Sequence, residues 1–211
     1  FGARDNKTFY AVNTADGSLK WSKTLEGSEA FVSSSPTVSG SVVYVGAHNG
    51  SLYALNTSDG SQVWTPYATS AGSSGIYNLS TPIIESGKIY FSYANSAVVA
   101  LDQTTGSKLW EKALAGSNSS ANATKILLDA PSSTLYAGGV DRVYALDITQ
   151  NGNFKWSQAA SGVLESGFAL WQGILVGGSR NNIVYAWNAT SGTELWQYSV
   201  KGQPGTPFLW E

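Results

Sequence analysis

Five copies of one short pattern constrain this chain more than any other feature of its sequence. Each copy runs from an apolar segment containing Ala, through a turn with Asn or Asp and then Gly, to a Trp. The copies span residues 9–21, 52–64, 98–110, 143–156 and 184–196. Successive tryptophans lie 43, 46, 46 and 40 residues apart, the period of four short strands per propeller blade and too long for leucine-rich or ankyrin repeats. The sequence therefore predicts an all-β propeller.

Each repeat divides into four predicted strands. In the second one, short or alternating apolar runs at residues 36–68 are separated by Asn-Gly and Asp-Gly turns, which join antiparallel strands. Convincing helical periodicity is absent. We expect one propeller domain of five four-stranded blades, with blade 1 split between residues 205–211 and 1–25, blade 2 at 34–68, blade 3 at 80–114, blade 4 at 124–160 and blade 5 at 166–201.

The split blade follows from the two ends of the sequence. Residues 205–210 are similar to the runs that begin blades at 35–38 and 80–84, and residues 1–6 align with 45–50. Pairing the two ends would close a ring and remove exposed sheet edges. Only 36 residues span this seam, however, against 40 to 46 elsewhere. A closed five-bladed ring and part of a larger propeller therefore remain alternatives.

The repeated pattern resembles a known family. The run Ala-Leu-Asp-Gln-Thr-Thr-Gly-Ser-Lys-Leu-Trp at residues 100–110 is similar to the tryptophan-docking motif of the quinoprotein, or PQQ-like, propellers, and all five copies carry a version of it. The family commonly forms larger rings, often of eight blades, so an excerpt from a longer protein would explain the short seam as well as a closed ring does. The resemblance also implies that each tryptophan of the series docks against the neighbouring blade: Trp21, Trp64, Trp110, Trp156 and Trp196.

Composition argues against several functions. The chain has no Cys, one His, and 12 Lys plus Arg against 14 Asp plus Glu without a basic cluster, so we expect no thiolate chemistry and no nucleic-acid partner. Its apolar runs are too short for a transmembrane segment.

The single histidine, His48, is predicted to be a turn residue. We expect no metal and no cofactor, because the paired cysteines that hold the quinone in related dehydrogenases are absent and no position matches their calcium ligands.

Two further tryptophans are candidate contacts for a ligand or partner. Trp171 and Trp210 lie near the ends of two predicted innermost strands. If they occupy equivalent sites on adjacent blades, they place two aromatic faces around one ring opening and suit a sugar or an apolar partner. The alternative is that both rings pack between blades, as large aromatic residues commonly do.

Asparagine-linked glycosylation is a second candidate feature. The chain contains seven Asn-X-Ser/Thr sequons, more than its Ser and Thr content alone predicts. They begin at Asn6, Asn49, Asn56, Asn78, Asn118, Asn122 and Asn188. This excess indicates a glycosylated, surface-exposed protein, although turns that favour Asn, Ser and Thr together produce the same pattern.

The recurring residues are thus assigned to the scaffold, and no reactive group of residues stands out. We expect a non-enzymatic, exported propeller that serves as a protein-interaction, assembly or cell-surface scaffold with a protein or glycan partner. Its expected location is extracellular or at the cell surface, with the periplasm as the alternative. A fragment of a PQQ-dependent dehydrogenase and a carbohydrate-binding propeller remain alternative functions.

Overall fold

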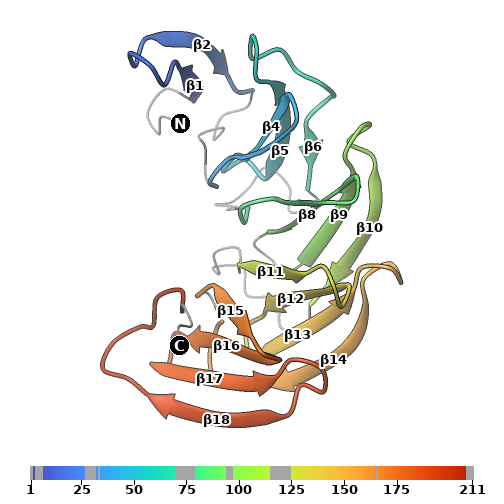
Figure 1. Cartoon of the computed structure of the whole chain (residues 1–211), viewed down its shortest axis with the longest axis vertical. Coiled ribbons are helices and arrows are strands. Elements are labelled where there is room, and N and C mark those ends of the chain that lie inside the picture. Colours follow the sequence, from blue (N-terminus) through green and yellow to red (C-terminus); the bar gives the residue numbers. More distant parts are fainter. Residues whose placement is uncertain are drawn as a thin grey trace.

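The computed structural model describes residues 2, 7–26, 32, 34–69, 79–93, 97–114, 125–164 and 166–207. Within these residues all regular structure is strand, arranged in one two-stranded and four four-stranded antiparallel sheets. In each four-stranded sheet the strands follow one another in chain order. Figure 1 shows the sheets side by side in an open arc, with β1 and β2 at one end and β15 to β18 at the other.

The strands have the following bounds. The first sheet consists of β1 (Thr8–Val12) and β2 (Leu19–Thr24). The second consists of β3 (Thr37–Ser39), β4 (Val42–Gly46), β5 (Ser51–Asn56) and β6 (Tyr67–Ala68). The third consists of β7 (Ile83–Glu85), β8 (Lys88–Tyr93), β9 (Ala97–Asp102) and β10 (Lys108–Ala113). The fourth consists of β11 (Ile126–Asp129), β12 (Thr134–Gly138), β13 (Arg142–Asp147) and β14 (Asn153–Ala159). The fifth consists of β15 (Phe168–Trp171), β16 (Ile174–Ser179), β17 (Ile183–Asn188) and β18 (Glu194–Ser199).

This architecture confirms the all-β propeller fold. At the N-terminal end, Gly2 bridges Phe9, which matches the pairing of Gly46 with Leu52 in the next sheet and agrees with the alignment of residues 1–6 with 45–50. At the other end, residues 205–207 belong to no strand. Residues 208–211 lie outside the described part of the chain, so the pairing of the two ends stays a prediction.

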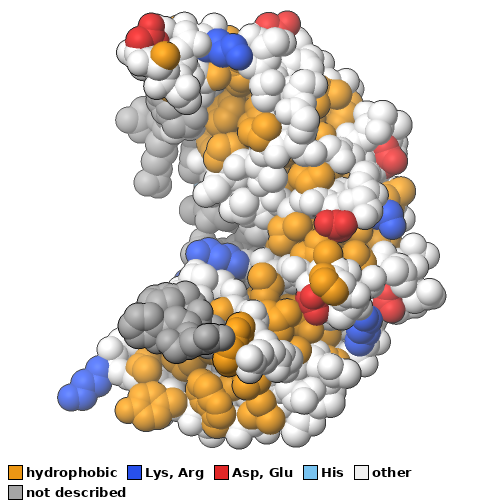
Figure 2. Space-filling view, in the orientation of Figure 1, with side chains coloured by type: hydrophobic (Ala, Val, Ile, Leu, Met, Phe, Trp, Pro, Cys, Tyr) orange, Lys and Arg blue, Asp and Glu red, His pale blue; other side chains and the backbone are white. Residues whose placement is uncertain are grey.

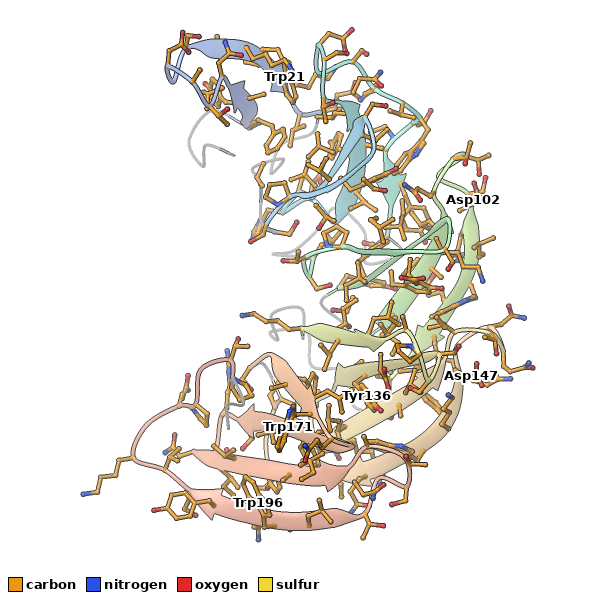
Figure 3. The ribbon with its side chains drawn as sticks, viewed as in Figure 1. Trp21, Asp102, Tyr136, Asp147, Trp171 and Trp196 are labelled. Carbon is orange, nitrogen blue, oxygen red and sulfur yellow. The ribbon has the colours of Figure 1, made fainter. Side chains whose placement is uncertain are left out.

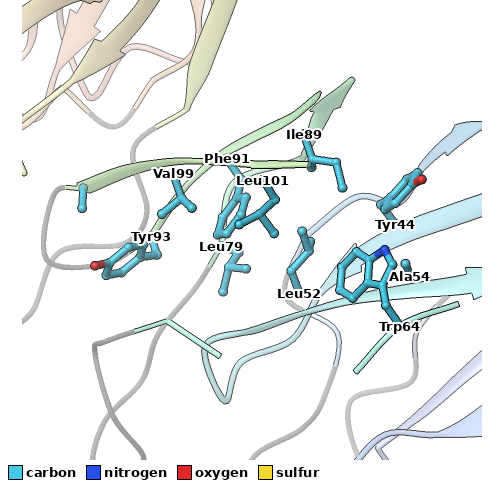
Figure 4. Packing of buried hydrophobic residues seen from close by; sticks show 11 residues of the cluster. Tyr44, Leu52, Ala54, Trp64, Leu79, Ile89, Phe91, Tyr93, Val99 and Leu101 are labelled. Atoms are coloured by element: carbon cyan, nitrogen blue, oxygen red, sulfur yellow. The ribbon is translucent and has the colours of Figure 1, made fainter. Parts of the chain in front are cut away.

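The core lies between successive sheets. The two middle strands of the second, third and fourth sheets are mostly buried along their length, because a neighbouring sheet packs on each face. Between the second and third sheets, Leu52 and Tyr44 meet Leu79, Ile89 and Phe91 in one cluster (Figure 4). Strands covered on both sides need uninterrupted apolar runs rather than strict alternation, which explains sequences such as Ala-Val-Val-Ala-Leu in β9.

Alanine and tryptophan recur together because they face each other across the outer hairpin. Ala100 is the cross-strand partner of Trp110, and Ala186 is the partner of Trp196. The register shifts next to such a pair in four of the sheets. A bulge of this kind turns a side chain out of the regular pleat, and the small Ala leaves room for the indole.

The outer strand of the second sheet is shorter than the sequence predicts. The expected strand at residues 61–68 is reduced to an isolated bridge between Leu55 and Gln62 and to the two residues of β6. Pro66 lies between these two pieces and has no N–H to donate to β5, so the ladder is interrupted there. Trp64 nevertheless keeps its position facing the third sheet, where it joins the core cluster.

One contact repeats at each junction between sheets. A Cβ atom placed on Gly60, in the outer turn of the second sheet, would lie 2.6 Å from Cε3 of Trp21 in the first sheet. Gly60 has φ 74°, a left-handed conformation that suits glycine. The indole Nε1 of Trp21 donates a hydrogen bond of 3.0 Å to the carbonyl of Thr57 in the same turn. The same close approach joins three more pairs: Trp64 with Gly106, Trp110 with Gly152, and Trp156 with Gly192.

Candidate functional site

The candidate site is a cavity at the junction of the fourth and fifth sheets. Its volume is about 460 Å³, and its lining includes Trp171, Lys155, Asp129, Thr134 and Thr190. We call it the Trp171 cavity. The volume lies within the usual range for small-ligand sites in proteins. Figure 3 places Trp171 and Tyr136 on adjoining sheets at this junction.

Trp171 forms the aromatic part of the lining. It is the last residue of β15, and the hairpin to β16 turns through Gln172 and Gly173, with φ of 46° and 77°. Positive φ at both central residues suits a tight two-residue hairpin, whose twist matches that of the strands. The turn holds the side chain of Trp171 at the rim of the sheet, where it stays 40% exposed. An exposed indole beside a cavity offers a flat face for stacking.

A hydrogen-bonded polar network from the fourth sheet forms another part of the lining. Lys155 Nζ donates to the carbonyl of Ser132 at 2.7 Å and to Thr134 Oγ1 at 2.8 Å. Ser132 Oγ donates to a carboxylate oxygen of Asp129. These residues come from the turn between β11 and β12 and from the outer strand β14. The network therefore fixes an ammonium group and a carboxylate within one lining.

Two side chains tie the fourth sheet to the fifth beneath this site. The carbonyl of Ala189 accepts a hydrogen bond from Tyr136 OH at 3.1 Å and another from Trp156 Nε1 at 3.0 Å. The rings of Tyr136 and Trp156 are 5.9 Å apart. Burial raises the pKa of the Tyr136 hydroxyl above its ordinary value, so this group remains a neutral donor at physiological pH. These bonds hold the two walls of the cavity in place.

The acidic side chains of the outer turns act within their own turns. Asp102 Oδ1 accepts hydrogen bonds from the backbone N–H groups of Thr104 and Thr105 and from Thr105 Oγ1. These bonds lower the pKa of the Asp102 carboxyl. Asp147 does the same with Thr149, and its pKa is lowered by that residue's hydroxyl and N–H. Figure 3 shows both aspartates at the outer rim of the arc.

The predicted contact residues are only partly placed. Trp171 lines the cavity, whereas Trp210 lies outside the described residues, so the expected pair of aromatic faces stays a prediction. Trp187 is fully buried and stacks on Tyr185 with ring centres 5.2 Å apart. His48 is buried as well. Within the described ranges, no group of three His, Cys, Asp or Glu is positioned to hold a metal ion.

Three of the seven sequons fall in the described part of the chain. Asn49 Nδ2 donates to the carbonyl of Glu26 at 2.9 Å, and Asn56 Nδ2 donates to Ser61 Oγ at 2.7 Å. Asn188 uses its Oδ1 to accept hydrogen bonds from the N–H groups of Thr190 and Ser191. The remaining four sequons lie outside the described residues: Asn6, Asn78, Asn118 and Asn122. Glycosylation at all seven stays a prediction.

Sequence reasoning did not find the polar network of the cavity. Lys155 precedes Trp156 at a position that is Lys, Val or Leu in the other repeats, and Asp129 lies 26 residues earlier. Comparison of the repeats gives one indication of the network, because three other repeats have Val or Leu at the position of Lys155. Lys20 holds the same position in the first repeat, so the sequence alone does not show which of the two lysines belongs to a site. Only the fold shows that Lys155 meets Ser132 and Thr134.

Across the described residues, we find no helix long and apolar enough to cross a membrane. Among solved structures, BamB from Moraxella catarrhalis matches with a TM-score of 0.80 and 21% identity, over 97% of this chain and 63% of that one. The computationally designed protein Ika8 matches with a TM-score of 0.77 and 15% identity, over 100% of this chain and 61% of that one. A europium-containing methanol dehydrogenase matches with a TM-score of 0.75 and 13% identity, over 94% of this chain and 48% of that one.

These identities show a shared fold, and this chain spans less than two thirds of the length of each of these structures. No curated protein matches the sequence. A family model described as outer membrane protein assembly factor BamB matches residues 1–198. The match covers all five repeats and confirms the PQQ-like repeat predicted from them. Because the model spans nearly the whole chain, this protein belongs to the outer membrane protein assembly factor BamB family.

Proposed function

We propose that this chain is a non-catalytic, exported propeller segment that binds other proteins during their assembly at a membrane or cell surface. The family description supports an assembly role. The observation that carries the proposal is the 40% exposed indole of Trp171 at the junction of two sheets, in one cavity lining with the hydrogen-bonded network of Lys155, Ser132 and Asp129. Such a site is built for recognition of a partner.

The composition of the Trp171 cavity suits a polypeptide. Tryptophan is enriched among the residues that contribute most to protein interfaces, where it is surrounded by groups that exclude water. Lys155 and Thr134 are already held by hydrogen bonds, so their ordering costs little when a partner binds. We propose that the occupant is an extended segment of a client protein that stacks an apolar side chain on Trp171 and hydrogen-bonds to the network.

A peptide array tests this function. Overlapping extended peptides from outer-membrane β-barrel proteins are presented to the full chain, and the strongest binder is titrated by fluorescence anisotropy. We expect Trp171→Ser to weaken binding about tenfold or more. Leu109→Ser is the matched control, because Leu109 is also half-exposed but does not line the cavity. Failure of every peptide to bind, or equal binding by Trp171→Ser, contradicts the proposal.

A carbohydrate ligand is a second candidate for the same cavity. The exposed face of Trp171 next to hydroxyl, ammonium and carboxylate groups is also the combination that holds a sugar ring. A glycan array with the same pair of variants separates the two functions. Saturable binding of a glycan that is lost in Trp171→Ser, without any peptide binding, selects the carbohydrate-binding propeller.

The alternative of a quinoprotein fragment draws support from the likeness in fold to methanol dehydrogenase. It is tested by adding pyrroloquinoline quinone and Ca²⁺ to the full chain and following the quinone absorbance and alcohol-dependent dye reduction. We expect neither a spectral shift nor turnover. Stoichiometric quinone binding would replace the scaffold proposal with the enzyme alternative.

The location of the protein is part of the proposal. The family description refers to an outer membrane, which favours the periplasmic alternative, whereas the seven sequons favour the cell surface. Fractionation of the source cells, followed by protease treatment of intact cells, distinguishes the two. Digestion in intact cells indicates the outer surface, and protection until the envelope is opened indicates the periplasm.

A further inference from the structure

One position of the repeat differs among the three junctions between four-stranded sheets. It directly follows the Asn or Asp of the outer turn, and it is Gln103 in the third sheet, Ile148 in the fourth and Ala189 in the fifth. In each case its N–H donates to a carbonyl in the hairpin between the first two strands of the same sheet: Gln103 to Gly87, Ile148 to Ser133, and Ala189 to Gly173. The three residues therefore hold equivalent places at their junctions.

The side chains of Gln103 and Ile148 fill their junctions. Nε2 of Gln103 donates a hydrogen bond of 3.0 Å to Ser39 Oγ in the second sheet. Burial raises the pKa of the Tyr44 hydroxyl, and a hydrogen bond with the Gln103 side chain opposes this shift in part. Ile148 is buried in the apolar cluster between the third and fourth sheets. One junction thus holds a carboxamide at this place, and the next holds an apolar side chain.

Ala189 leaves the equivalent place open, and the Trp171 cavity lies there. The groups around Gln103 have counterparts in its lining. Asp129 closes the first hairpin of its sheet as Ser39 does, and Tyr136 lies opposite the Ala of the third strand as Tyr44 does. Both sheets at this junction have all four strands, so the cavity is internal to the arc. It is the space of a side chain that this repeat lacks.

Two charged groups of the lining have hydrogen-bonding capacity beyond the network itself. An ammonium group has three N–H donors, and Lys155 uses two of them for Ser132 and Thr134. A carboxylate accepts at both oxygens, and Asp129 receives the Ser132 hydroxyl at Oδ2. On the face shown in Figure 2, acidic and basic side chains lie close together over the fourth sheet. One N–H of Lys155 and Oδ1 of Asp129 are therefore left for an occupant.

We propose that the Trp171 cavity takes the side-chain carboxamide of a glutamine or asparagine from the bound polypeptide. The group occupies the place that Gln103 fills at the junction of the second and third sheets. Its N–H donates to Oδ1 of Asp129, and its carbonyl oxygen accepts a hydrogen bond from Nζ of Lys155. This inference rests on the proposed function for the identity of the partner, and it adds the chemical group that the cavity selects.

The charges of the lining favour this neutral group over charged ones. A carboxylate is attracted by Lys155 but repelled by Asp129, and an amine experiences the reverse. Either charged group therefore gains little to offset its lost hydration. A carboxamide carries both a donor and an acceptor, so it uses both partners at once. Hydrogen bonds to ionised groups are stronger than those between neutral groups, and an apolar side chain of the same size forms neither bond.

Three substitutions at position 189 test the proposal without any partner. Ala189→Gln places a carboxamide in the cavity from the position that Gln103 holds in its own sheet. Ala189→Met adds a chain of similar length without the amide, and Ala189→Glu adds a carboxylate. Urea denaturation followed by circular dichroism should give Ala189→Gln the highest midpoint of the three. Asp129→Ala, made in the Gln and Met variants, should remove this advantage. A midpoint for Ala189→Gln no higher than that for Ala189→Met overturns the proposal.

Ala189→Gln should also block the site. The probe is the strongest binder from the peptide array, titrated by fluorescence anisotropy into the full chain. We expect its dissociation constant to rise about tenfold or more in Ala189→Gln, because the introduced carboxamide takes the place of the ligand's own. Thr104→Gln is the matched control, since it adds the same side chain at an exposed turn position that does not line the cavity. Equal binding by Ala189→Gln and Thr104→Gln contradicts the assignment.

Replacing the carboxamides of the peptide separates this inference from the proposed function. Each Gln or Asn of the binder is changed in turn to Met and to Glu, and we expect one position at which both changes weaken binding about tenfold or more. A peptide that needs Trp171 but tolerates every replacement overturns the inference and leaves the proposed function standing. If no peptide binds, the proposed function fails, and the stability series at position 189 still decides whether the cavity takes a carboxamide.

Discussion

The indole of Trp21 lies so close to Gly60 that a side chain at position 60 would overlap it, with a Cβ only 2.6 Å from Cε3. The hydrogen bond from Trp21 Nε1 to Thr57 fixes the ring in the same turn. The tryptophan and the glycine therefore act as one unit, although they belong to different repeats. This relationship leads to predictions about stability that compare equivalent positions inside the arc and at its ends.

Gly60→Ala should destabilise the protein more than Gly17→Ala. Both replacements place a Cβ on left-handed backbone, which costs about 1–2 kcal/mol. Only Gly60→Ala also makes a Cβ overlap with an indole, so we expect it to lower the free energy of unfolding by about 2–5 kcal/mol. Urea denaturation followed by circular dichroism measures the difference. Equal losses in the two variants would show that the contact with Trp21 relaxes without cost.

Trp110→Ala should cost more than Trp196→Ala, although both tryptophans end the same pattern. Removing a buried Trp leaves a cavity and costs about 3–5 kcal/mol, and Trp110 lies buried against Gly152. We expect less than half of this loss for the exposed Trp196. Thermal unfolding of the two variants gives both values. A larger loss for Trp196→Ala would mean that its ring is covered.

Asp102 should contribute to the acid sensitivity of the fold. Hydrogen bonds from Thr105 and Thr104 lower its pKa in the folded state. Its stabilising effect is therefore present above the unfolded pKa near 3.8 and is lost as pH falls through the lower folded pKa. Asp102→Asn, which keeps the acceptor oxygen, should flatten the pH dependence below pH 4 while preserving the turn, whereas Asp102→Ala should weaken the turn at every pH.

The pH profile of unfolding for the three proteins checks the prediction for Asp102. Asn occupies the equivalent position in three other turns, at Asn13, Asn56 and Asn188, so the amide is compatible with this geometry. An Asp102→Asn variant with unchanged acid sensitivity would show that other carboxylates dominate at low pH.

Tyr90 should resist ionisation to high pH. Burial, with a smaller contribution from Glu85, raises its pKa to about 12, and its ring packs on Trp110 at 5.9 Å. As pH rises from the ordinary tyrosine value of 10 toward 12, the unfolded chain ionises first and the folded state loses stability. NMR of ¹³Cζ-labelled tyrosine follows this residue, and the Tyr90→Phe variant assigns its signal. Titration near pH 10 would mean that water reaches the hydroxyl.

Among the described sequons, glycan occupancy should differ between Asn188 and Asn49. In Asn49 the amide nitrogen that would carry the glycan donates to the carbonyl of Glu26, whereas Asn188 accepts hydrogen bonds through its oxygen. We expect glycopeptide mapping of the natural protein to find Asn188 modified and Asn49 unmodified. Asn188→Gln should remove the corresponding mass step. A glycan on Asn49 would show that modification precedes formation of its hydrogen bonds.

The sequence alone determined the repeat and most of its local structure. The tryptophans recur at a regular period, each with an Ala before it and a Gly in its outer turn. These residues recur because their contacts lie within one hairpin or with the adjoining sheet. The fold class followed from them. The break in the second sheet was not predicted, although Pro66 was the residue that could have indicated it. Only the structure shows that β6 is reduced to two residues.

Tertiary structure decided what each equivalent residue does. Trp110 and Trp196 end nearly identical patterns, yet Trp110 is buried against Gly152 of the fourth sheet, whereas Trp196 is 46% exposed. Lys155 and Lys20 hold the same position in their repeats, but only the former joins the Trp171 cavity, since that requires the turn at Ser132 and the rim of the next sheet. Local sequence sets hairpin geometry, whereas a cavity between two sheets arises from how whole sheets pack.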